Sequence, residues 1–232
     1  AWRRTRQTRR RVHPRSSEVK IFIGYEEAHP EMYDVCKASI KRFSTTHEIY
    51  PLRKKKLGMY KRPYQGEATD FAFTRFLVPF LSDYRGWSLF CDGDFMWRSD
   101  PQEVLEYRDG SDVLVVKHPE LITTEGVKMD GKVNRPYPFK YWSSLMLMNC
   151  KNLKNLTDEY VNEAPAGDLH GFKWTDKVGN LPATFNNMVG YYDIYQPSAV
   201  HFTDGGPWLK GFEDQPYADE WRAVLHETQR PV

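Results

Sequence analysis

The sequence predicts an α/β domain in which helices flank a mostly parallel, mixed β-sheet. Short runs of β-branched and aromatic residues alternate along the chain with segments whose apolar residues have helical spacing. Such alternation is typical of βαβ units, whose strands pair in parallel and whose helices cover the faces of the sheet. In sheets of this kind, ligands bind beyond the carboxyl ends of the strands, where the loops meet. Candidate functional residues are therefore sought directly after the predicted strands.

The elements are expected in the following order. A strand covers Val19–Ile23 and ends at Gly24, and apolar residues at helical spacing predict a helix over Pro30–Phe43. The same criteria then predict a strand over His47–Leu52, a helix over Thr69–Leu81 interrupted at Pro79, and strands over Ser88–Cys91, Asp112–Lys117 and Ser143–Met148.

Two long segments lack these patterns and are predicted to be loops. They cover Thr123–Pro138, which is rich in glycine, proline and lysine, and Ala164–Gly179. Loops of this length inside a compact domain are usually functional or mobile. The chain of 232 residues suits one α/β domain, and it shows no internal repeat and no second boundary. We therefore expect residues 18–232 to form a single domain.

The N-terminal segment, residues 1–17, is predicted to be a flexible basic arm. Its first fifteen residues carry seven arginines and no acidic residue, although the whole chain has a net charge of only +2. Such an arm can touch nucleic acid or anionic lipid. No aromatic or amphipathic pattern accompanies the arginines, so a solvated terminus is favoured. We expect at most a weak contact with an anionic surface and no specific nucleic-acid partner.

Cysteine content and hydropathy indicate the compartment. Cys36, Cys91 and Cys150 are widely spaced and lie in apolar runs, and an odd, sparse set argues for reduced, buried thiols and against a disulfide scaffold. No apolar stretch approaches the ~20 residues that a membrane-spanning helix requires. The expectation is a cytoplasmic protein, at most peripheral to a membrane.

The strongest local signal is Asp92-Gly93-Asp94, which comes directly after the apolar run Ser88–Cys91. Two carboxylates one residue apart can point into the same cleft if the chain turns, and Gly93 permits such a turn. Carboxylate oxygens suit Mg²⁺ or Mn²⁺, which in turn neutralise a diphosphate. An ordinary acidic turn is the alternative, because Asp and Gly are common turn residues. Position after a buried strand favours the metal site.

A second signal lies far downstream, in the segment His201–Trp208. A histidine that ends a short apolar strand and precedes a glycine-rich turn can supply an imidazole as a third metal ligand. Mixed nitrogen and oxygen ligands favour Mn²⁺ over Ca²⁺. The backbone N–H groups of Gly205 and Gly206 could cradle a phosphate. Taken alone, a histidine beside a tight turn would be the preferred interpretation.

Several motifs in one order, from about Val19 to Trp221, resemble the family 8 glycosyltransferases and their bacterial relatives of GT-A (Rossmann-like) fold. The matching segments are Ala68–Pro79, Ser88–Asp94, Trp142–Asn149, Leu181-Pro182 followed by Phe185-Asn186, and His201–Trp208. The last two resemble an element near the acceptor and the closing motif that carries the third metal ligand. Each piece is modest, but the ordered set is specific.

The resemblance implies a metal-dependent transfer of a sugar from a nucleotide-sugar donor, a UDP-sugar, to a glycan or small-molecule acceptor, with retention of configuration. It implies polysaccharide biosynthesis as the setting. It also implies Asp92, Asp94 and His201 as ligands of Mn²⁺ (or Mg²⁺). The donor would be bound by the end of the first strand (Ile23 and Tyr25), by Arg75, Asp92 and Gly93, by the small polar residues Ser143 and Ser144, and by the closing turn (Gly205, Gly206).

The chain departs from the family pattern in three places. Gly206 stands where a lysine normally precedes the final Pro-Trp, in a motif one residue shorter than usual, which leaves Lys210 as a substitute for the diphosphate contact. The first strand ends Gly24-Tyr25-Glu26, where relatives often carry an aspartate. Asp168-Leu169-His170 occupies the place of the usual Asp-Gln pair, so Asp168 and Asp176 are the catalytic candidates near the reacting carbon.

Two other functions compete with sugar transfer. A nucleotidyltransferase also uses Asp-x-Asp after a strand, but it requires a third carboxylate on a neighbouring strand and has no use for His201. A basic-armed nucleic-acid-binding module would depend on the segment Arg3–Arg15. No recognition helix or RNA-binding signature accompanies that segment.

Overall fold

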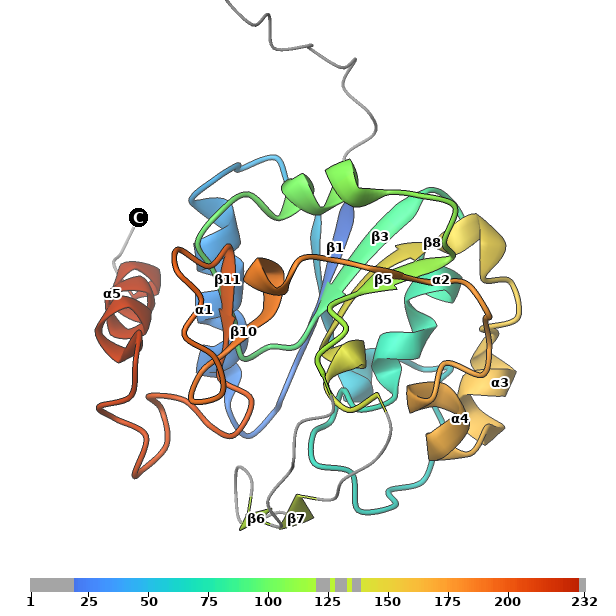
Figure 1. The fold of residues 1–232 in the computed structure, drawn as a ribbon. Coiled ribbons are helices and arrows are strands. Elements are labelled where there is room, and N and C mark those ends of the chain that lie inside the picture. Colours follow the sequence, from blue (N-terminus) through green and yellow to red (C-terminus); the bar gives the residue numbers. More distant parts are fainter. Residues whose placement is uncertain (1–18, 120–125, 128–132, 135–138, 230–232) are drawn as a thin grey trace, which may run out of the picture.

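The computed structural model describes residues 19–119, 126–127, 133–134 and 139–229. The predicted basic arm, residues 1–17, therefore lies outside the described residues. A six-stranded sheet forms the centre of the domain, in the order β2-β1-β3-β8-β5-β9 (Figure 1). Its strands are β1 (Lys20–Gly24), β2 (Ile49–Leu52), β3 (Trp87–Cys91), β5 (Val113–Val115), β8 (Leu145–Asn149) and β9 (Val178–Asn180). Only β8 is antiparallel to its neighbours, so the predicted mostly parallel, mixed sheet is confirmed.

The two faces of this sheet are covered by different helices. Residues alternate along each strand, so that Phe22 and Phe90 face one core while Ile21 and Leu89 face the other. The first core is closed by α2 (Val78–Leu81), α3 (Asp158–Glu163) and α4 (Ala166–His170), and the second by α1 (Pro30–Lys41) and the 3₁₀ helix Pro101–Tyr107. Figure 1 shows α1 on one side of the sheet and α2, α3 and α4 on the other.

A small second sheet joins the C-terminal part of the chain to the strand after the Asp-Gly-Asp turn. It contains β10 (Asn187–Met188), β11 (Ala199–His201) and β4 (Phe95–Trp97), and β11 lies between the other two. The C-terminal helix α5 (Ala218–Thr228) buries Trp221 and Val224 in a third cluster with Val200 of β11. In Figure 1, α5 lies beside α1 at the edge of the molecule.

Three predicted elements differ from the structure. The predicted helix Thr69–Leu81 is a series of turns, the 3₁₀ helix Thr74–Leu77 and the single-turn α2, in which Pro79 stands in the first turn. The predicted loop Ala164–Gly179 contains α4 and the first residues of β9. The predicted loop Thr123–Pro138 lies mostly outside the described residues, and its described part forms a short antiparallel pair, β6 (Gly126–Val127) with β7 (Val133–Asn134).

The cysteines are buried and unpaired, as predicted. The sulfur atoms of Cys36 and Cys91 lie 3.8 Å apart between α1 and β3. Burial and the neighbouring Cys91 thiol raise the pKa of the Cys36 thiol well above its usual value, so this thiol stays protonated. Among the helices of the described part of the chain, none has the length and apolarity needed to span a bilayer.

Candidate metal and donor site

The two aspartates lie where β3 leaves the main sheet. β3 ends at Cys91, β4 begins at Phe95, and the intervening turn presents Asp92 and Asp94 at the carboxyl edge of the sheet. The N–H of Asp92 donates to the carbonyl of Ser144 at 2.9 Å, which ties the turn to the start of β8. A Cβ atom on Gly93 would lie 2.5 Å from the carbonyl oxygen of Gly24. Glycine is therefore required here because β1 passes directly behind the turn.

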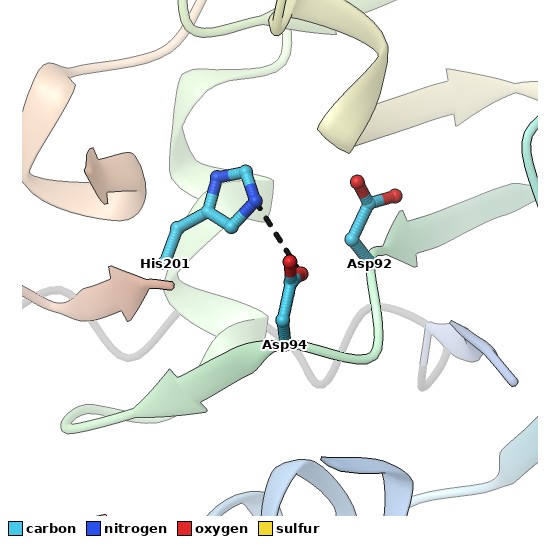
Figure 2. Close-up of side chains that lie close together, drawn as sticks. All are labelled: Asp92, Asp94 and His201. Atoms are coloured by element: carbon cyan, nitrogen blue, oxygen red, sulfur yellow. Dashed lines mark ion pairs between the residues drawn. The ribbon is translucent and has the colours of Figure 1, made fainter. Parts of the chain in front are cut away.

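His201 reaches the same place from the C-terminal part of the chain. In the antiparallel pairing of β11 with β4 it stands opposite Phe95, and the N–H of Phe202 donates to the carbonyl of Asp94 at 3.1 Å. The Nε2 atom of His201 lies 3.3 Å from Oδ1 of Asp94 (Figure 2). One ligand atom from each of Asp92, Asp94 and His201 can be chosen so that all three lie within 4.8 Å of one another. The structure thus brings the three predicted metal ligands together.

These three side chains fit a divalent cation. Oδ1 of Asp94 is buried and has no hydrogen-bond partner among the described residues, although it faces a ring nitrogen of His201. Ligand atoms around a cation with bonds of about 2.1 Å lie roughly 3 to 4 Å apart, so small side-chain rotations suffice to close the set. Two carboxylates and one imidazole suit Mn²⁺ or Mg²⁺.

Arg75 braces Asp92 within the site. Its Nη1 atom lies 3.0 Å from Oδ1 of Asp92 and donates to the carbonyl of Ser143 at 2.8 Å. The guanidinium group is buried between the rings of Phe71 and Phe90. Since Nη1 is already shared between the aspartate and the backbone, Arg75 is placed to orient Asp92.

Ser143 extends this arrangement to α4. Its hydroxyl group lies 2.9 Å from Nδ1 of His170. Burial, together with the positive charges of Arg75 and Arg62, lowers the pKa of His170 to about 3. His170 is therefore a neutral ring at neutral pH and packs edge-on against Phe76. Sequence reasoning noted His170 only as part of the segment 168–170, and the partnership with Ser143 has no local sequence signal.

The predicted donor residues at the end of β1 have different environments. Ile23 is fully buried in the core under α1, so its side chain is not available to a ligand. Tyr25 lies just beyond the strand, and the guanidinium carbon of Arg53 stacks over its ring at 4.0 Å from the ring centre. Arg53 follows β2, the parallel neighbour of β1.

The closing turn uses its glycines for packing. Gly205 has φ +140°, and its N–H donates to the carbonyl of Phe202 at 3.0 Å, so the prediction that this N–H cradles a phosphate is corrected. At Gly206, a Cβ atom would lie 1.8 Å from the ring of Trp208, so only glycine lets this ring pack on the turn. Lys210 is exposed on the following segment.

Only one of the two catalytic candidates lies on an element that reaches the site. Asp168 belongs to α4, the helix that carries His170, and it forms an ion pair with Lys173 at 2.6 Å. Asp176 precedes β9 on the side where Lys177 accepts a hydrogen bond from the N–H of Asp112. Since β5 and β9 are parallel, this is their amino end, whereas the metal ligands lie at the carboxyl end. The structure therefore does not bring Asp176 to the site.

Two further polar side chains near the site, His118 and Tyr191, were not predicted from the sequence. His118 follows β5 at the carboxyl edge of the sheet and stacks on Tyr192, with ring centres 5.6 Å apart. Its buried Nε2 atom has no hydrogen-bond partner among the described residues. Tyr191 donates its hydroxyl hydrogen to Asp204 at 2.7 Å. The pattern that indicated Asp92, a polar residue shortly after a buried strand, also applies to His118 and could have identified it.

Comparison with solved structures defines the class of fold. The chain superimposes on the bifunctional glycosyltransferase WbbM with a TM-score of 0.65 at 14% identity, covering 94% of this chain and 51% of that one. It also matches the galactosyltransferase LgtC in complex with donor and acceptor sugar analogues (TM-score 0.57, 11% identity, 92% and 98% covered). A third match is GlyE of Streptococcus pneumoniae (TM-score 0.55, 15% identity, 90% and 63% covered). The chain thus has the GT-A-like fold of glycosyltransferases, as predicted, and spans about half of WbbM.

The sequence comparison gives the family. The chain is 39% identical to Protein CDI of Arabidopsis thaliana over 235 residues, covering 93% of this chain and 90% of that protein. It belongs to the family of Protein CDI. No family model matches the chain, and membership of glycosyltransferase family 8 itself stays a prediction.

Proposed function

We propose that this protein is a metal-dependent glycosyltransferase that moves a sugar from a nucleotide-sugar donor, a UDP-sugar, to a hydroxyl group of a glycan or small-molecule acceptor. The observation that carries the proposal is the convergence of Asp92, Asp94 and His201 at the carboxyl edge of a GT-A-like sheet. Ligands of open α/β sheets bind at this edge. The solved glycosyltransferases of the same fold support the reaction class.

In this proposal, Asp92, Asp94 and His201 hold Mn²⁺ or Mg²⁺. When bound, such a cation stabilises the negative charge that grows on the departing nucleoside diphosphate. Arg75 keeps Asp92 in place through its contact at 3.0 Å. Ser143 and Ser144 stand directly before β8, beside Asp92, where small side chains leave room for the donor sugar.

We further propose retention of configuration, with Asp168 orienting the donor sugar. Asp168 is supported by its place on α4, because His170 of the same helix contacts Ser143. The proposed setting is polysaccharide biosynthesis in the cytoplasm, and the three unpaired cysteines agree with a reducing compartment. Analysis of the anomeric configuration of the product by NMR tests retention, and an inverted product overturns it.

The experiment that tests the reaction class is a thermal-shift screen of nucleotide sugars in the presence of Mn²⁺. A ligand that binds only the folded state stabilises it by about 2.7 kcal/mol at 100 times its Kd. For a domain of this size, that corresponds to roughly 5 to 10 °C. A UDP-sugar is expected to give the largest shift, followed by sugar transfer or donor hydrolysis.

The matched control is Asp94→Asn, which keeps the shape of the side chain and removes the carboxylate. This variant is expected to lose the part of the shift that depends on Mn²⁺. A larger shift with guanosine or cytidine donors overturns the choice of base. Stabilisation by nucleoside triphosphates but by no nucleotide sugar favours the nucleotidyltransferase and overturns sugar transfer.

A further inference from the structure

His201 is held on one face of its ring and at both of its ring nitrogens. The ring of Phe95 stacks on it with centres 4.4 Å apart and an interplanar angle of 21°. Nε2 points to Asp94, whereas Nδ1 lies 3.0 Å from Oδ1 of Asn186. Asn186 is fully buried at the end of the 3₁₀ helix Ala183–Asn186, directly before β10. The second ring nitrogen of a metal-binding histidine is where the protein can select the tautomer.

Asn186 belongs to a series of hydrogen bonds that runs from Tyr141 through Ser144 to His201. In each of these hydrogen bonds the donor can be identified. The hydroxyl group of Ser144 donates to the carbonyl oxygen of Tyr141 at 2.6 Å, and a carbonyl oxygen can only accept. The Ser144 oxygen must therefore accept the hydrogen bond of 2.9 Å from Asn186, which requires the NH₂ group of the amide on that side. Flipping the amide would place two acceptors against each other, inside a region from which water is excluded.

The amide of Asn186 consequently presents its carbonyl oxygen to His201. Because that oxygen only accepts, Nδ1 of His201 must carry a proton. In a neutral imidazole the lone pair then belongs to Nε2, which faces the unpartnered Oδ1 of Asp94. Two acceptor atoms turned towards each other at 3.3 Å form a position for a cation.

We infer that Asn186 is the positioning residue of the cation site, because its side-chain carbonyl holds the His201 proton on Nδ1 and so leaves Nε2 free to bind metal. The backbone of Tyr141, which anchors the chain of hydrogen bonds, has φ +70°, an uncommon conformation for a residue other than glycine. Ser144, expected to face the donor sugar, acts here through its hydroxyl group on the metal ligand. The inference rests on the proposed cation site, but the tautomer itself requires no cation.

The first test reads the tautomer directly in the cation-free protein. Long-range ¹H–¹⁵N NMR correlation distinguishes Nδ1–H from Nε2–H, and comparison with His201→Phe assigns the signal among the seven histidines. The expected result is that the neutral His201 ring carries its proton on Nδ1. The Nε2–H form in the wild-type protein overturns the inference, whatever the protein's activity.

The second test measures the affinity for Mn²⁺ alone by electron paramagnetic resonance titration. Asn186→Leu is expected to weaken binding 10- to 100-fold, the usual effect of losing the partner of a metal-binding histidine. Asn186→Asp keeps an acceptor for Nδ1–H and should restore binding, because the Ser144 hydroxyl can turn to donate to the second carboxylate oxygen while the carbonyl of Tyr141 keeps the N–H of Ser144. Asn187→Leu is the matched control, since Asn187 is equally buried in the next position but accepts only a long contact, 3.4 Å, from the N–H of Ile194.

The outcomes separate this inference from the proposed function. If folded Asn186→Leu binds Mn²⁺ as the wild type does, Asn186 does not position the ligand and the inference is overturned. If Asn186→Leu does not fold, Ser144→Ala replaces it, and a shift of His201 towards the Nε2–H form is expected. If the wild type binds no Mn²⁺, the proposed function fails, while the NMR result still decides the tautomer.

Discussion

Arg75 is the counter-charge of the cation-free site. It lies 3.0 Å from Asp92, and no solvent replaces it because both side chains are largely buried. Arg75→Met leaves the Asp92 carboxylate without this partner and the Ser143 carbonyl without its donor. Breaking a buried pair from one side costs about 3–5 kcal/mol. We expect a loss of that size in the free energy of unfolding, measured by urea denaturation in the presence of a chelator.

A cation should partly replace the missing charge in this variant. Mn²⁺ is therefore expected to stabilise Arg75→Met more than it stabilises the wild type. Arg75→Lys, which keeps the charge but loses the Nε–H donor to the carbonyl of Phe71, should lie between the two. Wild-type stability of Arg75→Met without cation would show that the pair with Asp92 contributes nothing.

His118 predicts how stability depends on pH. Burial lowers its pKa from 6.5 to about 4, and a charge on His201 acts in the same direction. Between these pH values the unfolded chain binds the proton and the folded protein does not, so stability present above pH 6.5 is lost as the pH falls towards 4. The contribution is at most about 1.4 kcal/mol per pH unit.

His118→Phe tests this dependence, because phenylalanine can keep the stacking on Tyr192 and cannot be protonated. Denaturation curves of cation-free protein between pH 7 and 4 should show a shallower loss of stability in the variant. The other titrating groups are common to both proteins and cancel in the difference. Equal slopes would mean that His118 takes up its proton at the same pH in the folded protein as in the unfolded chain.

Sequence reasoning found Asp92 and Asp94 because they follow a short apolar strand, whereas His201, which ends such a strand, was selected through the ordered set of motifs. It did not find the tautomer-fixing contact of Asn186. That contact joins the end of a 3₁₀ helix to a strand 15 residues later, and only the packed structure sets its distance. Asp176 was predicted because it lies close to Asp168 in the sequence. In the structure it precedes β9, at the amino end of that strand and away from the metal ligands.

At the scale of elements, the crossing of β1 and the Asp-Gly-Asp turn sets the geometry of the site. Gly93→Ala places a Cβ atom 2.5 Å from the carbonyl oxygen of Gly24, and backbone atoms must move to admit it. Overpacking of this kind costs about 1–3 kcal/mol. The turn that carries Asp92 and Asp94 is expected to shift with it, so Mn²⁺ affinity should fall together with the midpoint of thermal unfolding.

Gly110→Ala is the control for this substitution. A Cβ atom at Gly110 meets nothing within 4 Å, so the variant should keep both its stability and its Mn²⁺ affinity. If Gly93→Ala bound Mn²⁺ as tightly as the wild type, the close approach of β1 would not position the aspartates.

The strands could be predicted from the sequence, whereas some of the helices could not. Apolar runs such as Ser88–Cys91 become strands because both faces of the sheet are covered. The segment Thr69–Leu81, predicted to be a helix, forms turns and a 3₁₀ helix before α2, and Arg75 of this segment contacts Asp92 and the carbonyl of Ser143. The short α4 was missed because its five residues carry too few apolar positions for a helical period.

At the scale of the molecule, the metal site joins two sheets. Asp92 follows the central strand β3, whereas His201 belongs to the three-stranded sheet that α5 holds against α1. The GT-A-like architecture was predictable from the order of the motifs. The dependence of His201 on the C-terminal helix was not, because helix packing over long sequence distances leaves no local pattern.

This arrangement predicts that damage to α5 reaches the site while equal damage elsewhere does not. Trp221→Ala empties the cluster under β11 and should cost about 3–5 kcal/mol, and Leu156→Ala in the core on the other face of the sheet should cost about 2–5 kcal/mol. Both variants are expected to unfold at lower urea concentration than the wild type. Only Trp221→Ala should also weaken Mn²⁺ binding in the folded protein, because β11 loses the packing that holds His201 opposite Phe95. Equal Mn²⁺ affinities in the two variants would mean that the neighbours of β11 in its own sheet, β4 and β10, hold His201 in place without help from the C-terminal helix.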